Sequence, residues 1–125
     1  MKRFATAVVV VLLFSIPATT ARAGQGDVIR RGSCSRRSDW KLKLSTQDGR
    51  IEVEFEVDQN VIGDRWRVTF RHDGDVVLKA MRTTRGASGS FEVRTVEPNH
   101  AGSDALRARA RNVSTGEVCV GSASL

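Results

Sequence analysis

The sequence predicts an all-β domain of seven strands arranged as a two-sheet sandwich. Three observations lead to this fold class. Apolar and polar residues alternate with a period of two in several short segments, and turn-forming residues separate these segments at regular intervals. No segment after residue 23 shows a helical period. Seven short strands in roughly 100 residues are typical of a two-sheet sandwich.

The first 23 residues have the layout of a secretory signal peptide. Lys2 and Arg3 precede an apolar run that ends near Ile16, and residues 21–23 (ARA) form an A-x-A cleavage site. The run is shorter than the roughly 18 to 20 residues that a membrane-spanning helix needs. We therefore expect cleavage before Gly24 and a protein without a membrane span, located outside the cell or at its envelope.

The 102 residues that follow the cleavage site are enough for one small domain and too few for two. We divide them into an N-terminal leader, 24–39, and a β-sandwich domain, 40–125, and we expect a monomer. Three of the 20 Lys and Arg residues and none of the 14 acids lie before the cleavage site, which leaves 17 bases and a net charge of +3. This mild excess excludes a generally polybasic protein. Arginine outnumbers lysine 16 to 4, which is typical of GC-rich bacterial genomes such as those of actinobacteria.

Cys34 and Cys119 are the only cysteines of the chain. In an exported protein we expect them to form a disulfide that ties the leader to the last strand. By the chain-entropy estimate, a bond that closes the chain between the two cysteines stabilises the folded state by on the order of 4 to 5 kcal/mol. The sequence contains no C-x-x-C motif, so we interpret the bond as structural rather than redox-active.

The strands can be assigned in chain order from their alternation and from the turns between them. Regular alternation predicts strands at 40–45, 50–57, 65–71, 90–96 and 106–112, and less regular apolar runs predict strands at 75–81 and 117–124. The turns between them lie at 48–49 (DG), 73–74 (DG), 86–90, 97–104 and 114–116.

The segment IEVEFEVD, 51–58, carries an acid at every second position, and these acids could form a metal site, a catalytic face or a solvated face. A two-residue hairpin turn at 48–49 places Lys43 opposite Glu54 and Lys41 opposite Glu56. Opposite charges that face each other across strands stabilise a sheet by roughly 0.2 to 1 kcal/mol per pair. We therefore interpret these acids as one half of a solvated, charge-paired face.

Two segments resemble fibronectin type III and related immunoglobulin-like domains. RWRVTFRHDGDVV, 65–77, resembles the third strand of such domains with Trp66 as the core aromatic, and LRARARNVSTGE, 106–117, resembles their sixth strand and its hairpin. Leu106 stands near the place where that strand usually carries a core tyrosine. The resemblance implies a seven-stranded, two-sheet immunoglobulin-like sandwich. The whole chain is also similar to small secreted actinobacterial proteins that have no assigned activity.

In this topology the third and sixth strands are neighbours, and their outward residues form a surface that we call the arginine face. With Trp66 and Leu106 directed inward, alternation directs six arginines outward, with no acid among them. They are Arg65, Arg67, Arg71, Arg107, Arg109 and Arg111. The positive charges of such a face repel one another unless a partner or counter-ions supply negative charge. The alternative is a solvated face that protects the sheet from aggregation.

The sequence gives little indication of catalytic residues, and we predict that the protein is not an enzyme. His72 and His100 are the only histidines, and we interpret both as hydrogen-bonding surface residues in or beside turns. We expect no cofactor and no standard metal site, because the segment from Asp58 lacks ligands at two positions of a calcium loop. The sequence does not decide whether Asp58, Asn60 and Asp64 form a weak calcium site.

Two functions remain. The first is a secreted binding module that uses the arginine face on an anionic polymer or an acidic protein. The second is a structural or inhibitory extracellular protein that presents loop 97–104 or loop 58–64 to a protein partner. Binding driven by charge weakens steeply with ionic strength, whereas binding by an inserted loop changes much less.

Overall fold

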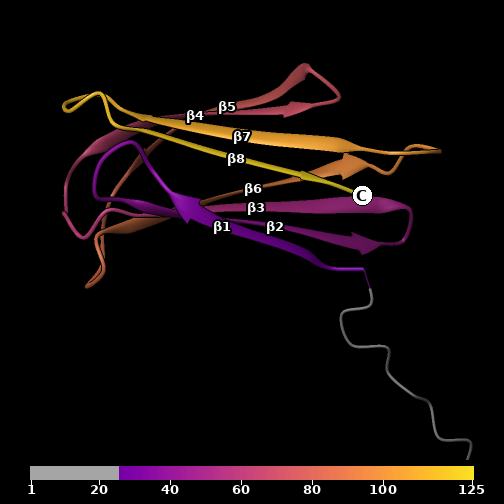
Figure 1. Cartoon of the computed structure of the whole chain (residues 1–125), viewed down its shortest axis with the longest axis horizontal. Coiled ribbons are helices and arrows are strands. Elements are labelled where there is room, and N and C mark those ends of the chain that lie inside the picture. The colour runs from indigo at the N-terminus through magenta and orange to yellow at the C-terminus, as the bar shows by residue number, and fades with distance from the viewer. Residues whose placement is uncertain (1–25) are drawn as a thin grey trace, which may run out of the picture.

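The computed structural model describes residues 26–125, which form two antiparallel sheets and no helix. The strands are β1 (Val28–Ser33), β2 (Asp39–Gln47), β3 (Arg50–Asp58), β4 (Arg65–His72), β5 (Asp75–Thr83), β6 (Ser90–Pro98), β7 (Ala105–Asn112) and β8 (Val118–Ser124). The sheets have the strand orders β1-β2-β3-β6 and β5-β4-β7-β8, and they pack face to face as two layers (Figure 1). The all-β sandwich is therefore confirmed, with one strand more than predicted. The predicted signal peptide, 1–23, lies outside the described residues.

The additional strand is β1, which lies within the segment 24–39 that we expected to be a leader. It pairs with β2 from Val28 opposite Leu44 to Ser33 opposite Asp39, at the edge of its sheet. Most of its residues are exposed, and its sequence, VIRRGS, lacks the alternation that marks the other strands. An edge strand of this kind buries too little apolar surface to give a period-of-two signal.

The two Asp-Gly turns fix the hairpins in which they lie. Asp48 and Gly49 have φ angles of 51° and 72°, and Asp73 and Gly74 have φ angles of 49° and 88°. Positive φ at both central residues is typical of the type I′ turns that connect paired strands. The first turn sets Gln47 opposite Arg50, so the predicted register of β2 and β3 is confirmed along the whole hairpin.

The core fills the space between the sheets and determines which residues of β4 and β7 point outward. The inward residues of both strands are buried as predicted, and they include Trp66, Val68 and Phe70 of β4 and Leu106, Ala108 and Ala110 of β7. Small residues of β7 lie beside larger ones of β4, as Ala108 does beside Phe70. Because strand residues alternate between faces, this packing leaves the arginines on the outer surface.

The predicted disulfide between Cys34 and Cys119 is present, with the two Cα atoms 4.3 Å apart. Cys34 follows β1 and Cys119 lies in β8, so the bond joins the two sheets along one side. Next to it, the buried carboxylate of Glu117 accepts hydrogen bonds from the backbone N–H groups of Arg36 and Ser38 and from the Ser38 hydroxyl. The segment between β1 and β2 is thus held by a covalent bond and by several hydrogen bonds.

Candidate functional site

The six predicted arginines share one exposed surface on β4 and β7. The two strands are hydrogen-bonded neighbours, and their register sets Arg67 opposite Arg111 and Arg71 opposite Arg107. Arg109 lies opposite Thr69, and Arg65 lies at the start of β4. All six residues are exposed. The arginine face is therefore a continuous surface formed by two paired strands.

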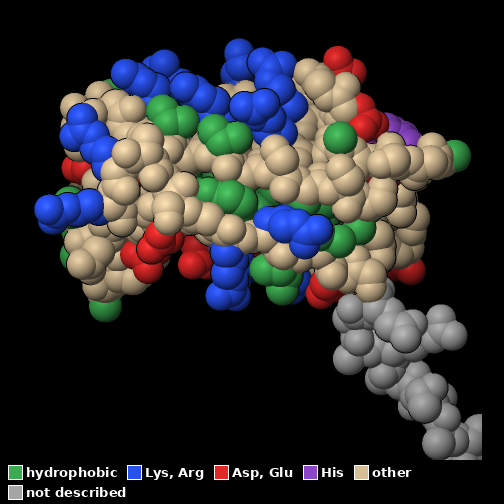
Figure 2. Space-filling model, viewed as in Figure 1, with side chains coloured by type: hydrophobic (Ala, Val, Ile, Leu, Met, Phe, Trp, Pro, Cys, Tyr) green, Lys and Arg blue, Asp and Glu red, His purple; other side chains and the backbone are tan. Residues whose placement is uncertain are grey.

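The charge of the arginine face is not neutralised by neighbouring acids. None of the outward residues of β4 and β7 is acidic, and among residues 26–125 the ion pairs involve other bases. Arg71 donates a hydrogen bond to the backbone carbonyl of Gly74, 3.0 Å away. Figure 2 shows Lys and Arg side chains gathered over the sheet that contains β4 and β7.

One further base extends the arginine face. Lys79 of β5 lies opposite Thr69 of β4 and is exposed. The sequence did not identify this residue as part of the face because alternation in 75–81 is irregular. The register of β4 and β5 shifts between Phe70 and Arg71, which accounts for the irregular pattern.

A hollow in the middle of the arginine face could hold a small anionic group. It measures about 350 Å³ and is lined by Thr69, Arg71, Arg107 and Arg109. Guanidinium groups donate pairs of parallel hydrogen bonds to phosphate, sulfate or carboxylate oxygens. Three guanidinium groups around one hollow can therefore bind a single anionic group of an extended ligand.

The outer face of the other sheet has a mixed charge. The predicted register of β2 and β3 places Lys43 opposite Glu54, but the close ion pairs of the acids are formed with Arg94 of β6. The Arg94 guanidinium lies 3.0 Å from Glu52 and 2.8 Å from Glu54, and it also pairs with Glu92. Burial raises the pKa of Glu54, and the positive charge of Arg94 opposes this rise. The acids of β3 therefore belong to a charge-paired face, although the main base is not the predicted one.

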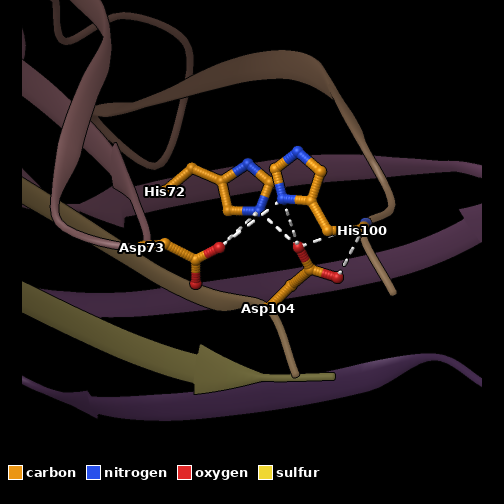
Figure 3. A group of neighbouring side chains, drawn as sticks. All are labelled: His72, Asp73, His100 and Asp104. Carbon is orange, nitrogen blue, oxygen red and sulfur yellow. Dashed lines mark hydrogen bonds and ion pairs between the residues drawn. The ribbon is translucent and has the colours of Figure 1, made fainter. Parts of the chain in front are cut away.

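A second group of charged side chains, the His–Asp cluster, consists of His72, Asp73, His100 and Asp104 (Figure 3). Nε2 of His72 lies 2.6 Å from Oδ1 of Asp104 and 3.6 Å from Oδ2 of Asp73. Nδ1 of His100 lies 3.2 Å and 3.6 Å from the same two oxygens. The two imidazole rings stack with their centroids 4.8 Å apart. The surface position that we predicted is correct for His100 and wrong for His72, which is only 5% exposed.

Carboxylates contact both ring nitrogens of His72. In addition to the contact of Nε2 with Asp104, Nδ1 lies 3.3 Å from Oε1 of Glu97. Burial lowers the pKa of His72, but the hydrogen bonds to Asp104 and Glu97 outweigh this effect and raise the pKa above its ordinary value of 6.5. The hydrogen bond to His72 in turn lowers the pKa of Asp104, against the effect of burial. The cluster therefore favours positive charge between its carboxylates.

Three segments of the chain position the His–Asp cluster. His72 is the last residue of β4, and Asp73 begins the turn that follows. Asp104 ends the loop between β6 and β7, and its backbone exchanges two hydrogen bonds of 2.9 Å with Leu125. The sequence did not reveal the cluster because these segments lie far apart along the chain. The antiparallel pairing of β4 and β7 was the available signal, since it places His72 beside Leu106 and hence near this loop.

Side-chain hydrogen bonds hold loop 58–64, the loop for which the sequence did not decide whether a weak calcium site is present. Oδ2 of Asp64 accepts hydrogen bonds from Gln59 at 2.6 Å and from Asn112 at 2.9 Å. These bonds lower the pKa of Asp64, with Asn112 contributing most. Gln59 also accepts a hydrogen bond from the indole N–H of Trp66. The Asp64 carboxylate therefore connects this loop to β4 and β7, which gives it a structural role.

No protein-family model matches the chain, and no curated protein or solved structure is significantly similar to it. The strand arrangement itself is compatible with an immunoglobulin-like sandwich, in which two antiparallel sheets enclose one core. Within residues 26–125 no helix has the length and apolar character needed to cross a membrane. The arginine face and the His–Asp cluster are therefore the features of this chain that bear on its function.

Proposed function

We propose that the protein is a secreted, non-enzymatic binding module that binds a linear anionic polymer through the arginine face. The observation that carries this proposal is the placement of six exposed arginines on two paired strands, with no acid among the outward residues. The face offers guanidinium groups and the hydroxyl of Thr69, and its outward residues on β4 and β7 include no carboxylate or imidazole to act as a general base, so we propose binding without catalysis.

The geometry of the arginine face favours an extended ligand over a small one. Alternate residues of a strand lie about 7 Å apart and neighbouring strands about 4.8 Å apart, so the guanidinium groups form a grid. A polymer with repeated phosphate or sulfate groups can contact such a grid at several points at once. Each contact releases a condensed counter-ion, which adds to the affinity at low salt.

We also propose that the protein is exported. We propose further that its domain is related to fibronectin type III and immunoglobulin-like domains and that its relatives are small secreted actinobacterial proteins. The predicted signal peptide and the disulfide support export, because disulfides persist in oxidising compartments. The strand order supports the classification, since β5 extends the β4-β7-β8 sheet as an extra strand does in variable-type domains. The mass of the exported protein should correspond to a start at Gly24, and a start at Met1 would contradict cleavage.

The binding proposal can be tested by elution of the protein from immobilised heparin or polyphosphate with rising salt. The face variant replaces Arg107, Arg109 and Arg111 by serine. The control variant replaces Arg30, Arg36 and Arg37 by serine, which removes the same charge from exposed positions on β1 and the segment after it. We expect the face variant to elute at much lower salt than the wild type and the control variant to elute close to the wild type.

Three outcomes would contradict the binding proposal. Equal shifts for the two variants would mean that net charge, rather than the arginine face, drives retention. No retention of the wild type at roughly physiological salt, where charges are screened over about 8 Å, would leave the arginines as a solvated face. Retention on an acidic protein but on neither polymer would identify a different class of ligand.

A further inference from the structure

We infer that the His–Asp cluster is a zinc-binding site, with His72, Asp73, His100 and Asp104 as the four ligands. Each residue offers one nitrogen or oxygen atom, and these four atoms all lie within 4.8 Å of one another. The cluster lies at the end of β4, outside the arginine face, so this inference is independent of the proposed function.

The distances within the cluster suit a tetrahedral ion. Zinc binds imidazole nitrogens and carboxylate oxygens at about 2.0 to 2.2 Å, so the ligand atoms of a tetrahedral site lie about 3.3 to 3.6 Å apart. The four nitrogen–oxygen distances of the cluster are 2.6, 3.2, 3.6 and 3.6 Å. The contact between His72 and Asp104 has to lengthen most for the ion to enter, and the widest separation among the four ligand atoms, up to 4.8 Å, has to shorten.

The types of ligand atom narrow the choice of metal. Calcium and magnesium prefer sites made entirely of oxygen atoms, whereas this cluster offers two imidazole nitrogens and two carboxylate oxygens. Imidazole nitrogen suits zinc and other late transition metals. Four protein ligands complete a tetrahedral zinc site, so we infer a structural ion rather than a catalytic one.

Contacts outside the four ligand atoms hold the ligands in place. Glu97, whose side chain is 12% exposed, faces Nδ1 of His72 on the side opposite the cluster, as carboxylates do behind metal-binding histidines. Oδ1 of Asp73 accepts a hydrogen bond of 2.8 Å from the backbone N–H of Ala105. Oδ2 of Asp104 accepts one of 3.2 Å from the backbone N–H of His100. The ligands are therefore oriented by the fold itself, which reduces the entropy that metal binding has to overcome.

A zinc ion at this position would connect three parts of the chain. His72 and Asp73 belong to the β4–β5 hairpin and His100 and Asp104 to the loop between β6 and β7, and the third part is the C-terminal Leu125, whose backbone exchanges hydrogen bonds with that of Asp104. The ion would thus fix the loop that ends at Asp104 to the end of the sandwich. Binding to the folded state alone raises the stability of that state.

The test is a calorimetric titration with zinc chloride of the folded, disulfide-bonded protein, after treatment with a chelator and removal of the chelator. We expect one zinc ion per chain and a higher midpoint of thermal unfolding with zinc. His100→Ala and Asp73→Asn should each weaken zinc binding by at least about 10- to 100-fold. Loss of a partner outside the ligand shell already has an effect of this size, and these two residues are themselves ligands. Their side chains are 54% and 42% exposed, so we expect both variants to fold.

Asp75→Asn is the matched control, because it removes an exposed carboxylate near the same turn but outside the cluster. It should bind zinc as tightly as the wild type. Cobalt(II) in place of zinc should give the intense visible absorption of a tetrahedral complex. Each of the following results would overturn the inference: no saturable binding by the wild type, unchanged affinity in His100→Ala, an equal loss in Asp75→Asn, or the weak absorption of six-coordinate cobalt.

Discussion

Glu117 holds the segment between β1 and β2 to the opposite sheet. It is only 4% exposed, and its carboxylate accepts hydrogen bonds of 3.0 and 2.9 Å from two backbone N–H groups and one of 2.6 Å from a hydroxyl. A buried carboxylate is tolerated where several donors replace its hydration shell. Removal of the carboxylate would leave the donors of Arg36 and Ser38 without a partner.

We predict that Glu117→Ala lowers the free energy of unfolding by about 2 to 3 kcal/mol, because hydrogen bonds to a charged acceptor are lost inside the protein. Urea denaturation measures this change. Glu56→Ala is the control, since Glu56 is half-buried on the outer face of β3 and its loss should cost less than about 0.5 kcal/mol. Equal losses for the two variants would show that the Glu117 hydrogen bonds contribute nothing specific.

Asp64 should make stability depend on acid pH. Its pKa in the folded protein is lower than its ordinary value of 3.8, because Asn112 and Gln59 donate hydrogen bonds to the carboxylate. The contribution of ionised Asp64 is therefore fully present above the unfolded pKa, and it is lost as the pH falls through the folded pKa. Asp64→Asn lacks this contribution at every pH.

We predict that the difference in unfolding free energy between the wild type and Asp64→Asn is largest near neutral pH and shrinks as the pH falls below 3.8. Urea denaturation of both proteins over a series of pH values gives this difference. A difference that stays constant from neutral to acid pH would mean that the charge of Asp64 does not stabilise the fold.

At the scale of elements, Trp40 of β2 connects the edge strands of the two sheets. A Cβ atom added to Gly32 of β1 would lie 2.7 Å from the indole ring, and one added to Gly121 of β8 would lie 2.8 Å from it. The ring therefore lies against glycines of both strands. Glycine is needed at these positions because any side chain would collide with the ring.

We predict that Gly121→Ala lowers the free energy of unfolding by about 1 to 3 kcal/mol, the usual cost of overpacking. The ring cannot move away freely, because the backbone of Gly32 also lies against it. Ser122→Ala is the control, since Ser122 is the next residue of β8 and is exposed. Thermal unfolding that is the same for Gly121→Ala and the wild type would show that Trp40 has room to move.

The charge pairs of the β1-β2-β3-β6 sheet can be ranked by double-mutant cycles. Glu54 lies 2.8 Å from Arg94 of β6, whereas the Nζ of Lys43 lies near Asp27, 3.8 Å away. We predict that alanine substitutions at Glu54 and Arg94 are more strongly coupled in unfolding free energy than those at Glu54 and Lys43. A larger coupling with Lys43 would mean that the β2–β3 pair dominates in solution.

Most elements could be predicted because local chemistry determines them. The turn at Asp48 and Gly49 sets the register of a whole hairpin, and this register then places every residue of β2 and β3 on a face. β1 could not be predicted, because an exposed edge strand with two arginines lacks alternation. The choice of Arg94 over Lys43 as the partner of Glu54 depends on the pairing of β3 with β6, which no local pattern specifies.

For the whole molecule, the two outer faces differ in charge although the sheets share one core. The β1-β2-β3-β6 sheet mixes lysines, glutamates and Arg94, whereas β4 and β7 carry only arginine among their charged outward residues. The arginine face could be predicted, because alternation and the neighbouring position of the two strands suffice to place it. The His–Asp cluster was not predicted, because it also depends on the course of the loop between β6 and β7, which brings Asp104 to His72 and which no local pattern specifies.

The salt dependence of polymer binding is the decisive measurement for the arginine face. The affinity for a soluble polyphosphate should be measured over a series of salt concentrations for the wild type, for the variant with Arg107, Arg109 and Arg111 replaced by serine, and for the matched variant at Arg30, Arg36 and Arg37. Each neutralised phosphate contributes about 0.7 to 0.9 to the slope of log affinity against log salt. We predict that the face variant loses about 2 to 3 from the magnitude of this slope and that the matched variant keeps the slope of the wild type. An equal slope for the two variants would contradict a specific role of the arginine face in binding.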